Sequence, residues 1–124
     1  MKVTTEKNEK LANMVFGSIY PLYLNRLVKN GRTQEELDQV LRWFTGYSQA
    51  ELEARIEEKA TYRDFFEKAT IHPNADLIKG VVCGYRIEEI EKEFELYKQC
   101  RQMEKLIDEL ARGRKMDKIL RKAT

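Results

Sequence analysis

Two helices and the turn between them are predicted by residues 30–56, whose sequence is NGRTQEELDQVLRWFTGYSQAELEARI. Gly31 can end a preceding helix, because glycine takes the left-handed conformation that a helix C-terminus needs. Thr33 is a good N-cap for the next helix, and Glu36 three residues later completes a capping box. This stretch therefore specifies where helices begin and end as well as where they run.

The second helix of this stretch begins in the same way as the first. Gly46 can end the first helix, and Ser48 with Glu51 forms a second capping box. Between these ends the apolar residues recur at intervals of three and four, which places them on one helix face. They are Leu37, Val40, Leu41 and Phe44 in the first helix and Leu52 and Ile56 in the second.

Toward the N-terminus we expect a helix that is capped by Ser18 and runs to about Lys29. Pro21 favours this start, because proline is tolerated in the first turn of a helix, where its missing N–H removes no hydrogen bond. Residues before Phe16 can form a short helix or a mobile segment. The pattern leaves both alternatives open.

Two short helices are predicted between Thr61 and Gly84. Thr61 can cap the first, which ends ahead of Pro73 because the residue before a proline avoids helical geometry. Asn74 can cap the second. Residues 81–83 could instead form a strand, but we find no second strand candidate to pair with them.

A long amphipathic helix is predicted from Arg86 to Ala111, since nothing in this range interrupts it. Its apolar residues follow a seven-residue repeat only at first, so we expect the central helix of a globular bundle rather than a coiled coil. Gly113 ends it, and a last short helix follows. The predicted fold is all-α, a compact bundle of five or six helices with one long C-terminal amphipathic helix. We expect a single domain over residues 1–124, with 1–12 as a possible mobile segment and 113–124 as a short basic terminal helix.

The cysteines and the histidine do not predict a metal site or a cofactor. Cys83, Cys100 and His72 have no close ligand spacing and cannot supply a four-ligand zinc site by themselves. The first ten residues lack the apolar core of a secretory signal, and no apolar run is long enough to span a bilayer. We therefore expect a cytoplasmic protein whose two cysteines are free, buried thiols.

Six separated stretches resemble one known family in the same order. They are YPLY (20–23), GRT (31–33), WFTGY (43–47), GVVCG (80–84), RIEEIE (86–91) and KLIDELARG (105–113). Over roughly residues 15–121 the chain resembles the bacterial domain-of-unknown-function family numbered 2200. The resemblance implies a bacterial cytoplasmic protein of unassigned activity. Its members tend to carry an Asx-Pro break where this chain has Lys92-Glu93, so we expect the long helix to be more continuous here.

Charge is distributed unevenly along the chain. The net charge is +2, yet residues 1–111 hold 17 basic and 20 acidic groups, and the remaining residues hold six basic groups against Asp117. A basic segment of this kind can attract nucleic acid or an acidic protein surface. It can also be a solvated helix end, because cations complement the negative pole of the helix dipole. The candidate binding residues are Arg112, Arg114, Lys115, Lys118, Arg121 and Lys122.

A second group of residues could bind a small anionic ligand. Aromatic residues and two arginines lie near predicted helix ends. If these helix ends lie close together in the fold, the residues would line a pocket with aromatic side chains and two guanidinium groups. The alternative is that they rim the core with their polar tips in water. The residues are Tyr20, Tyr23, Arg32, Trp43, Tyr47, Tyr85 and Arg86.

The sequence favours neither catalysis nor DNA binding through a helix-turn-helix. His72 and Cys83 could form a nucleophilic pair only if folding placed them in contact, and nothing in the sequence requires it. The helices joined near Gly46 have a helix-turn-helix outline, but residues 51–59 carry four glutamates against two cations, which opposes phosphate binding.

We therefore expect a non-enzymatic protein-interaction module that can pair with a second copy of itself. Its acidic stretch, residues 88–95, would contact the basic segment of the other copy. Added salt, or reversal of Arg114, Lys115 and Lys118 to glutamate, should then weaken assembly. Nucleic-acid binding through the basic segment and small-anion binding are the alternatives.

Overall fold

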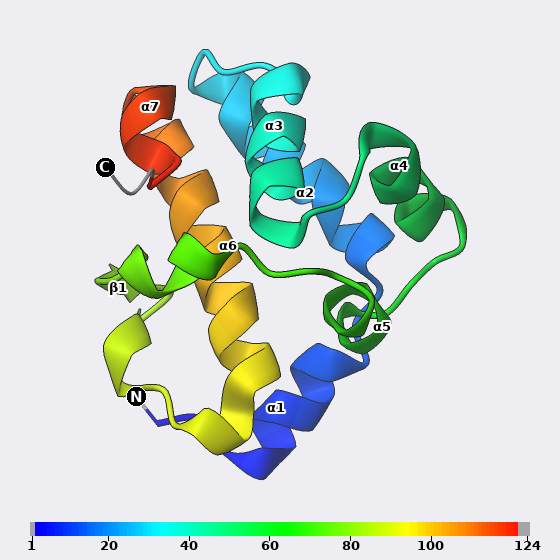
Figure 1. Ribbon diagram of the computed structural model, residues 1–124, viewed down its shortest axis with the longest axis vertical. Coiled ribbons are helices and arrows are strands. Elements are labelled where there is room, and N and C mark those ends of the chain that lie inside the picture. Colours follow the sequence, from blue (N-terminus) through cyan, green and yellow to red (C-terminus); the bar gives the residue numbers. More distant parts are fainter. Residues whose placement is uncertain (1, 122–124) are drawn as a thin grey trace.

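The computed structural model describes residues 2–121, which form a helical bundle with one small β-hairpin (Figure 1). Seven α-helices lie within this range, and the prediction of an all-α bundle with a long C-terminal helix is confirmed. No helix of residues 2–121 combines the length and the apolar character needed to cross a membrane. The elements are α1 Thr5–Ala12, α2 Phe16–Lys29, α3 Gln34–Thr45, α4 Gln49–Glu57, α5 Tyr62–Glu67, η1 Pro73–Leu77, β1 Val81–Val82, β2 Tyr85–Arg86, η2 Ile87–Glu89, η3 Lys92–Phe94, α6 Glu95–Ala111 and α7 Met116–Ile119.

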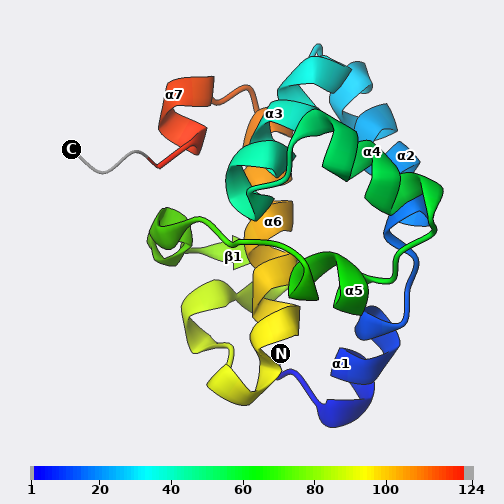
Figure 2. The ribbon, with the colours of Figure 1, turned by 45° about the vertical axis from the view of Figure 1, so that its right-hand side comes forward.

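Helix α6 is the centre of the bundle. It has 17 residues, and α1, α2, α3, α5, α7 and β1 all pack against it (Figure 2). Its apolar face is buried, and burial of these side chains supplies the main stabilisation of the fold. The buried apolar residues of this face are Tyr97, Cys100, Met103, Leu106, Ile107 and Leu110.

The predicted helix ends around α3 and α4 are confirmed. The Thr33 hydroxyl accepts the Glu36 N–H, and the Glu36 carboxylate accepts the Thr33 N–H, so the capping box is complete. Ser48 and Glu51 do the same for α4. Gly46 takes φ 74° at the end of α3, in the left-handed region that glycine favours.

The first two helices differ from the prediction at their ends. Helix α2 begins at Phe16, not after Ser18, and Pro21 lies inside it. Tertiary contacts set this start, because the Phe16 ring is buried and stacks on Phe65 with ring centroids 4.0 Å apart. Residues 5–12, for which the sequence left two alternatives, form α1 with Thr4 as its cap.

The long helix begins at Glu95, so the prediction of a helix from Arg86 is wrong. Residues 81–94 form the β1–β2 hairpin and two 3₁₀ turns instead, and the expected continuity at Lys92 fails because η3 is a separate turn. Ile87, Ile90 and Phe94 are buried all the same. A 3₁₀ turn repeats every three residues, so its apolar spacing resembles that of an α-helix.

The β1–β2 hairpin was missed because its turn is unusual. Val82 pairs with Tyr85 across a two-residue turn in which Cys83 has φ 51° and Gly84 φ 81°. Two-residue hairpins favour positive φ at both central positions, which Asn-Gly satisfies more often than Cys-Gly. The prediction that no second strand exists is therefore wrong. The prediction that Cys83 is buried is also wrong, because Cys83 is exposed in this turn.

The segment ahead of the hairpin also begins differently from the prediction. Its cap is His72 rather than Asn74, because the His72 Nδ1 atom accepts the Asn74 N–H at 2.9 Å. The helix that follows is a 3₁₀ turn, η1, that ends at Leu77 before the hairpin. The assignment of residues 1–124 to one domain stays a prediction.

Candidate functional site

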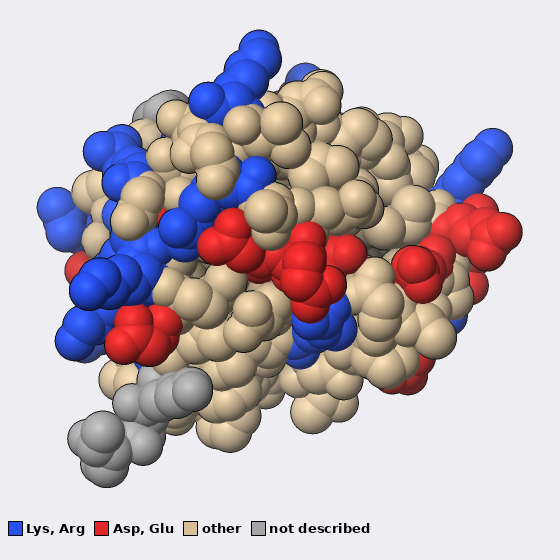
Figure 3. All heavy atoms as spheres, turned by 90° about the horizontal axis from the view of Figure 1, so that it is seen from above, with Lys and Arg blue, Asp and Glu red and all other residues tan. Residues whose placement is uncertain are grey.

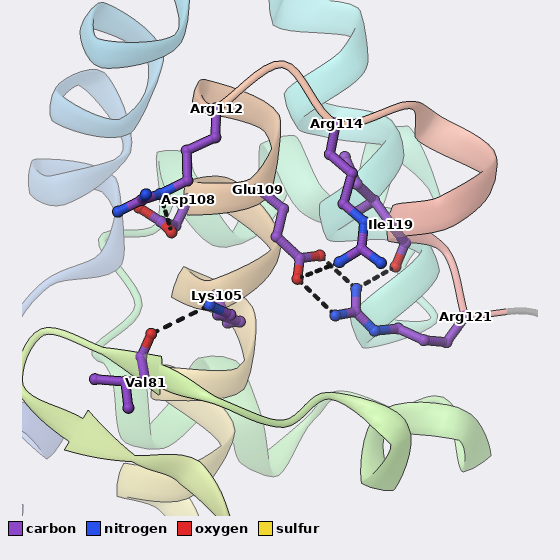
Figure 4. Close-up of polar contacts among 8 residues, drawn as sticks. All are labelled: Val81, Lys105, Asp108, Glu109, Arg112, Arg114, Ile119 and Arg121. Atoms are coloured by element: carbon purple, nitrogen blue, oxygen red, sulfur yellow. Dashed lines mark hydrogen bonds and ion pairs between the residues drawn. The ribbon is translucent and has the colours of Figure 1, made fainter.

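The basic segment begins where α6 ends, and two acidic residues of α6 hold several of its arginines. Arg112 pairs with Asp108, with Nε 2.9 Å from Oδ2. Arg114 and Arg121 both bind Glu109, at 2.8 Å and 2.5 Å (Figure 4). Glu109 is buried, and the arginines that bind it lie on either side of α7 in the sequence. These two ion pairs therefore hold α7 against the end of α6.

The two lysines of this segment are less engaged. Lys115 and Lys118 are exposed, and within residues 2–121 no carboxylate lies within ion-pair distance of either. Lys122, the sixth predicted binding residue, lies outside the described residues. Here the name "basic end" is given to the surface formed by Arg112, Arg114, Lys115, Lys118 and Arg121.

Two arginines from earlier in the chain join the basic end. Arg26 donates to Asp108 at 2.6 Å, and Arg32 donates to the Arg114 carbonyl at 2.6 Å. Burial favours the neutral form of Asp108, but the hydrogen bond from Arg26 and the charge of Arg112 outweigh it and lower the pKa of Asp108. In Figure 3, Lys and Arg side chains gather over the side where α7 lies.

A cluster of glutamates lies at the other end of α6. We call this cluster the acidic end. All five of its glutamates are exposed, and one of them is the first residue of α6. Lys92 lies among them in the sequence. The protonated Glu93 carboxyl can donate to the Glu91 carboxylate, which raises the pKa of Glu93 and reflects the proximity of two negative groups. The Gly80 N–H donates to Glu88 and lowers the pKa of Glu88. The acidic end consists of Glu88, Glu89, Glu91, Glu93 and Glu95.

The predicted aromatic and arginine residues are not gathered into one pocket. The hydroxyl of Tyr20 donates to Asp38 at 2.5 Å, and that of Tyr47 donates to the Phe65 carbonyl at 2.5 Å. Both hydroxyl groups are buried and bonded to protein groups, so these two tyrosines neither line the predicted pocket nor hold their polar tips in water.

The other predicted pocket residues also lie apart. Trp43 stacks on His72, with ring centroids 4.2 Å apart. Arg32 contacts the basic end through its hydrogen bond to the Arg114 carbonyl, and Arg86 is exposed beside Glu88, 3.7 Å away.

Tyr23 belongs to a part-buried polar cluster beneath the hairpin. Its hydroxyl lies 2.8 Å from that of Tyr62 and donates to Glu104 at 3.0 Å. Arg101 donates to the other Glu104 oxygen, so the carboxylate is held from two sides. This cluster ties α2, α5 and α6 together.

Cys83 and His72, the residues weighed as a nucleophilic pair, have separate surroundings. The His72 ring stacks on Trp43 and accepts the Asn74 N–H, whereas the Cys83 Sγ atom lies 3.9 Å from a Glu104 oxygen. Partial burial of the thiol and the negative charge of Glu104 raise the pKa of Cys83. A raised pKa disfavours the thiolate, which is the nucleophilic form.

Tyr85 lies in a hollow of about 270 Å³ between α1, β2 and α6. Apart from Tyr85, none of its lining residues was predicted to bind a ligand, because they are distant in sequence and no local motif connects them. The only sequence signals are the three-residue spacing of two lysines on α1 and the four-residue spacing of a tyrosine and an arginine on α6. The lining residues are Lys7, Lys10, Leu11, Met14, Tyr85, Tyr97 and Arg101.

No cluster of three or more His, Cys, Asp or Glu side chains suited to a metal ion occurs within the described range. Residues 10–121 match the model of a family described as "Uncharacterized protein conserved in bacteria (DUF2200)". The fold is similar to that in the crystal structure of uncharacterized protein SP1917, with a TM-score of 0.83 and 35% sequence identity, over 90% of this chain and 91% of that chain. Among curated proteins, none matches this sequence.

Proposed function

The chain belongs to DUF2200, a bacterial family of uncharacterized proteins, and from its surface we propose that it is a protein-interaction module that pairs with a second copy of itself. In this homodimer the basic end of each copy contacts the acidic end of the other. A two-fold axis makes both contacts equivalent, because the same surface of each copy then faces its counterpart. A cytoplasmic location stays a prediction.

The observation that carries the proposal is the placement of the two ends. The basic end lies at the C-terminus of α6 and Glu93 and Glu95 lie at its N-terminus, and the 17 residues of this helix correspond to about 25 Å. Glu88 lies nearer the middle of α6, because it accepts from Gly80, which is beside Lys105. Both ends lie on the same side of α6, the left in Figures 1 and 2, with the hairpin between them. They are too far apart to neutralise each other within one chain, but an antiparallel second copy would bring opposite charges together twice.

The surface between the two ends supplies apolar contact area. Leu77 of η1 is 49% exposed and Val81 of β1 is 47% exposed. Asn74 connects this surface to the basic end by donating to the Arg121 carbonyl at 2.7 Å, and Gly80 connects it to the acidic end by donating to Glu88 at 2.7 Å. Apolar residues at the centre and charged residues at the rim are typical of protein interfaces.

Light scattering behind size exclusion, at about 50 mM and about 500 mM salt, tests the proposal. We expect a dimer at low salt that dissociates in part at high salt, because salt screens exposed charges. Lys115→Glu with Lys118→Glu should give a monomer at both salt concentrations, since both lysines are exposed and have no partner carboxylate among residues 2–121.

A control is Lys59→Glu with Lys68→Glu, which reverses two exposed lysines near α4 and α5 and should leave the dimer unchanged. Lys68 differs from the tested lysines in lying 3.6 Å from Glu58, so Lys59→Glu is also measured alone. A dimer that is indifferent to salt and to the Lys115 and Lys118 reversals would overturn the charge-pairing model. A monomer that elutes with excess absorbance at 260 nm would also contradict it, and would point to nucleic acid on the basic end.

A further inference from the structure

We propose that the hollow between α1, β2 and α6 binds a small organic anion with one aromatic ring, such as an aromatic carboxylate. This site is separate from the proposed dimer contact and shares no residue with it. Its residues come from α1 and the turn that follows it, the hairpin and the first half of α6.

Three cations and no carboxylate line the hollow. Arg101 is paired with Glu104 behind the lining, so its charge is already partly balanced. Lys7 and Lys10 are exposed, and among residues 2–121 no carboxylate lies within ion-pair distance of either. Two unpaired ammonium groups beside a part-buried guanidinium favour an anion over a neutral or cationic ligand.

Two tyrosines form the rigid wall of the hollow. The rings of Tyr85 and Tyr97 meet edge to face, with centroids 5.3 Å apart, and both residues are buried. The Arg101 guanidinium lies 4.8 Å from the centre of the Tyr97 ring, and its Nη2 donates to the Tyr97 hydroxyl at 2.8 Å. Because these side chains are already held in place, binding costs little additional ordering.

The Tyr85 hydroxyl lies beside hydrogen-bond donors and positive charge, whereas burial raises the pKa of Tyr97. The Tyr97 hydroxyl donates to that of Tyr85, which lowers the pKa of Tyr85, and the nearby Lys7 lowers it further. Lys7 also lies 5.9 Å from the centre of the Tyr85 ring. The phenol oxygen of Tyr85 is thus surrounded by donors and positive charge, which would equally stabilise a bound carboxylate.

Size and apolar contacts limit the ligand. The hollow of about 270 Å³ is just below the usual range for small-molecule sites, about 300–1,000 Å³. Leu11 and Met14 supply apolar surface opposite the tyrosines. One ring with one carboxylate fits this volume.

The test is an NMR titration of the full chain with benzoate, benzamide and inorganic phosphate. Benzoate should give saturable shifts at the backbone amides of Leu11, Tyr85 and Arg101. Benzamide has the same ring without the charge and should bind about tenfold more weakly, or not measurably. Phosphate has the charge without the ring and should not reproduce the shifts.

Variants decide whether the hollow itself is the site. Lys7→Gln with Lys10→Gln should weaken benzoate binding about tenfold, whereas Lys115→Gln with Lys118→Gln at the basic end should not change it. Met14 is 38% exposed, so Met14→Ala should keep the fold and weaken benzoate binding severalfold. Equal affinity for benzoate and benzamide, no saturable shift at these amides, or unchanged affinity in the Lys7 and Lys10 variant would overturn the proposal.

Discussion

At the scale of single residues, the carboxylates of Asp108 and Glu109 decide how much of the basic segment is free. Both are buried at the end of α6, and each binds at least two arginines. A buried charge is costly unless it is paired, so these arginines are needed for folding as well as for the surface charge. In the sequence the six cations of this segment look equivalent. In the structure the arginines are paired with buried carboxylates, whereas Lys115 and Lys118 have no carboxylate partner among residues 2–121.

Asp108 should make the stability of the protein depend on acid pH. Its pKa in the folded state is lower than that of an ordinary aspartate, so its contribution to stability is present above the unfolded-state pKa and is lost as the pH falls through the folded-state pKa. Urea unfolding should show Asp108→Asn to be less stable than the wild type at pH 7, with a smaller difference at pH 3. Asp117→Asn, at an exposed position of α7, is the control. A difference that grows toward pH 3 would contradict this account.

Two glycines in the left-handed conformation provide a matched pair of substitutions. Gly31 and Gly46 have φ 79° and 74°, so alanine at either position should cost about 1 kcal/mol from backbone strain. At Gly46 an added Cβ would also lie 2.9 Å from the Thr70 carbonyl oxygen, whereas at Gly31 nothing lies within 4 Å. Urea unfolding should therefore show Gly46→Ala to be clearly more destabilising than Gly31→Ala. Equal losses in the free energy of unfolding for the two variants would contradict the close approach of Thr70 to Gly46.

At the scale of elements, the sequence predicted the helices whose ends are specified locally. The capping boxes of α3 and α4 and the Thr61 cap of α5 all depend on residues within one turn. Residues 81–94 were predicted wrongly, because a Cys-Gly hairpin turn and 3₁₀ turns share the spacing of a helix. The start of α2 was missed because it depends on Phe16 packing against Phe65, which is distant in sequence.

The cap of α3 should contribute measurably to stability. Thr33→Ala removes the acceptor for the Glu36 N–H, 3.2 Å away, and should lower the free energy of unfolding by about 1 kcal/mol. Thr33→Ser keeps the hydroxyl and should retain most of that stability. Chemical denaturation of both variants checks this, and an alanine variant as stable as the wild type would show that the cap is not needed.

The hollow beside α6 shows why sites are harder to predict than helices. Tyr97 was assigned to the apolar face of the helix, which is correct, but its contact with Tyr85 depends on the hairpin. Lys7 and Lys10 approach it only because α1 packs against α6. Of the seven residues predicted to bind an anion, Tyr85 alone lines this hollow.

At the scale of the whole molecule, charge is separated along the axis of α6, and an apolar surface lies between the two ends. If that surface is the centre of a dimer interface, Leu77→Ser with Val81→Ser should raise the dissociation constant about a hundredfold or more. A symmetric dimer loses four apolar side chains, and even half of the usual contribution of about 1.5–3 kcal/mol for each sums to about 3 kcal/mol. Leu22→Ser with Val28→Ser changes two exposed residues of α2 and should leave the constant unchanged. Sedimentation equilibrium measures both, and equal effects would exclude this surface.

The most direct test of the central claim is a charge-swap experiment by sedimentation equilibrium. Chains with Lys115→Glu and Lys118→Glu keep only Arg112, Arg114 and Arg121 as cations of the basic end, and all three are held by Asp108 or Glu109. Chains with Glu91→Lys and Glu93→Lys lose most of the negative charge of the acidic end. Each should be monomeric alone, because the charge attraction is lost and the two new charges of each variant face residues of the same sign at the dimer contact. An equimolar mixture should form a one-to-one heterodimer at low salt. Two variants that stay monomeric when mixed, or that each still dimerise alone, would contradict the pairing of the basic end with the acidic end.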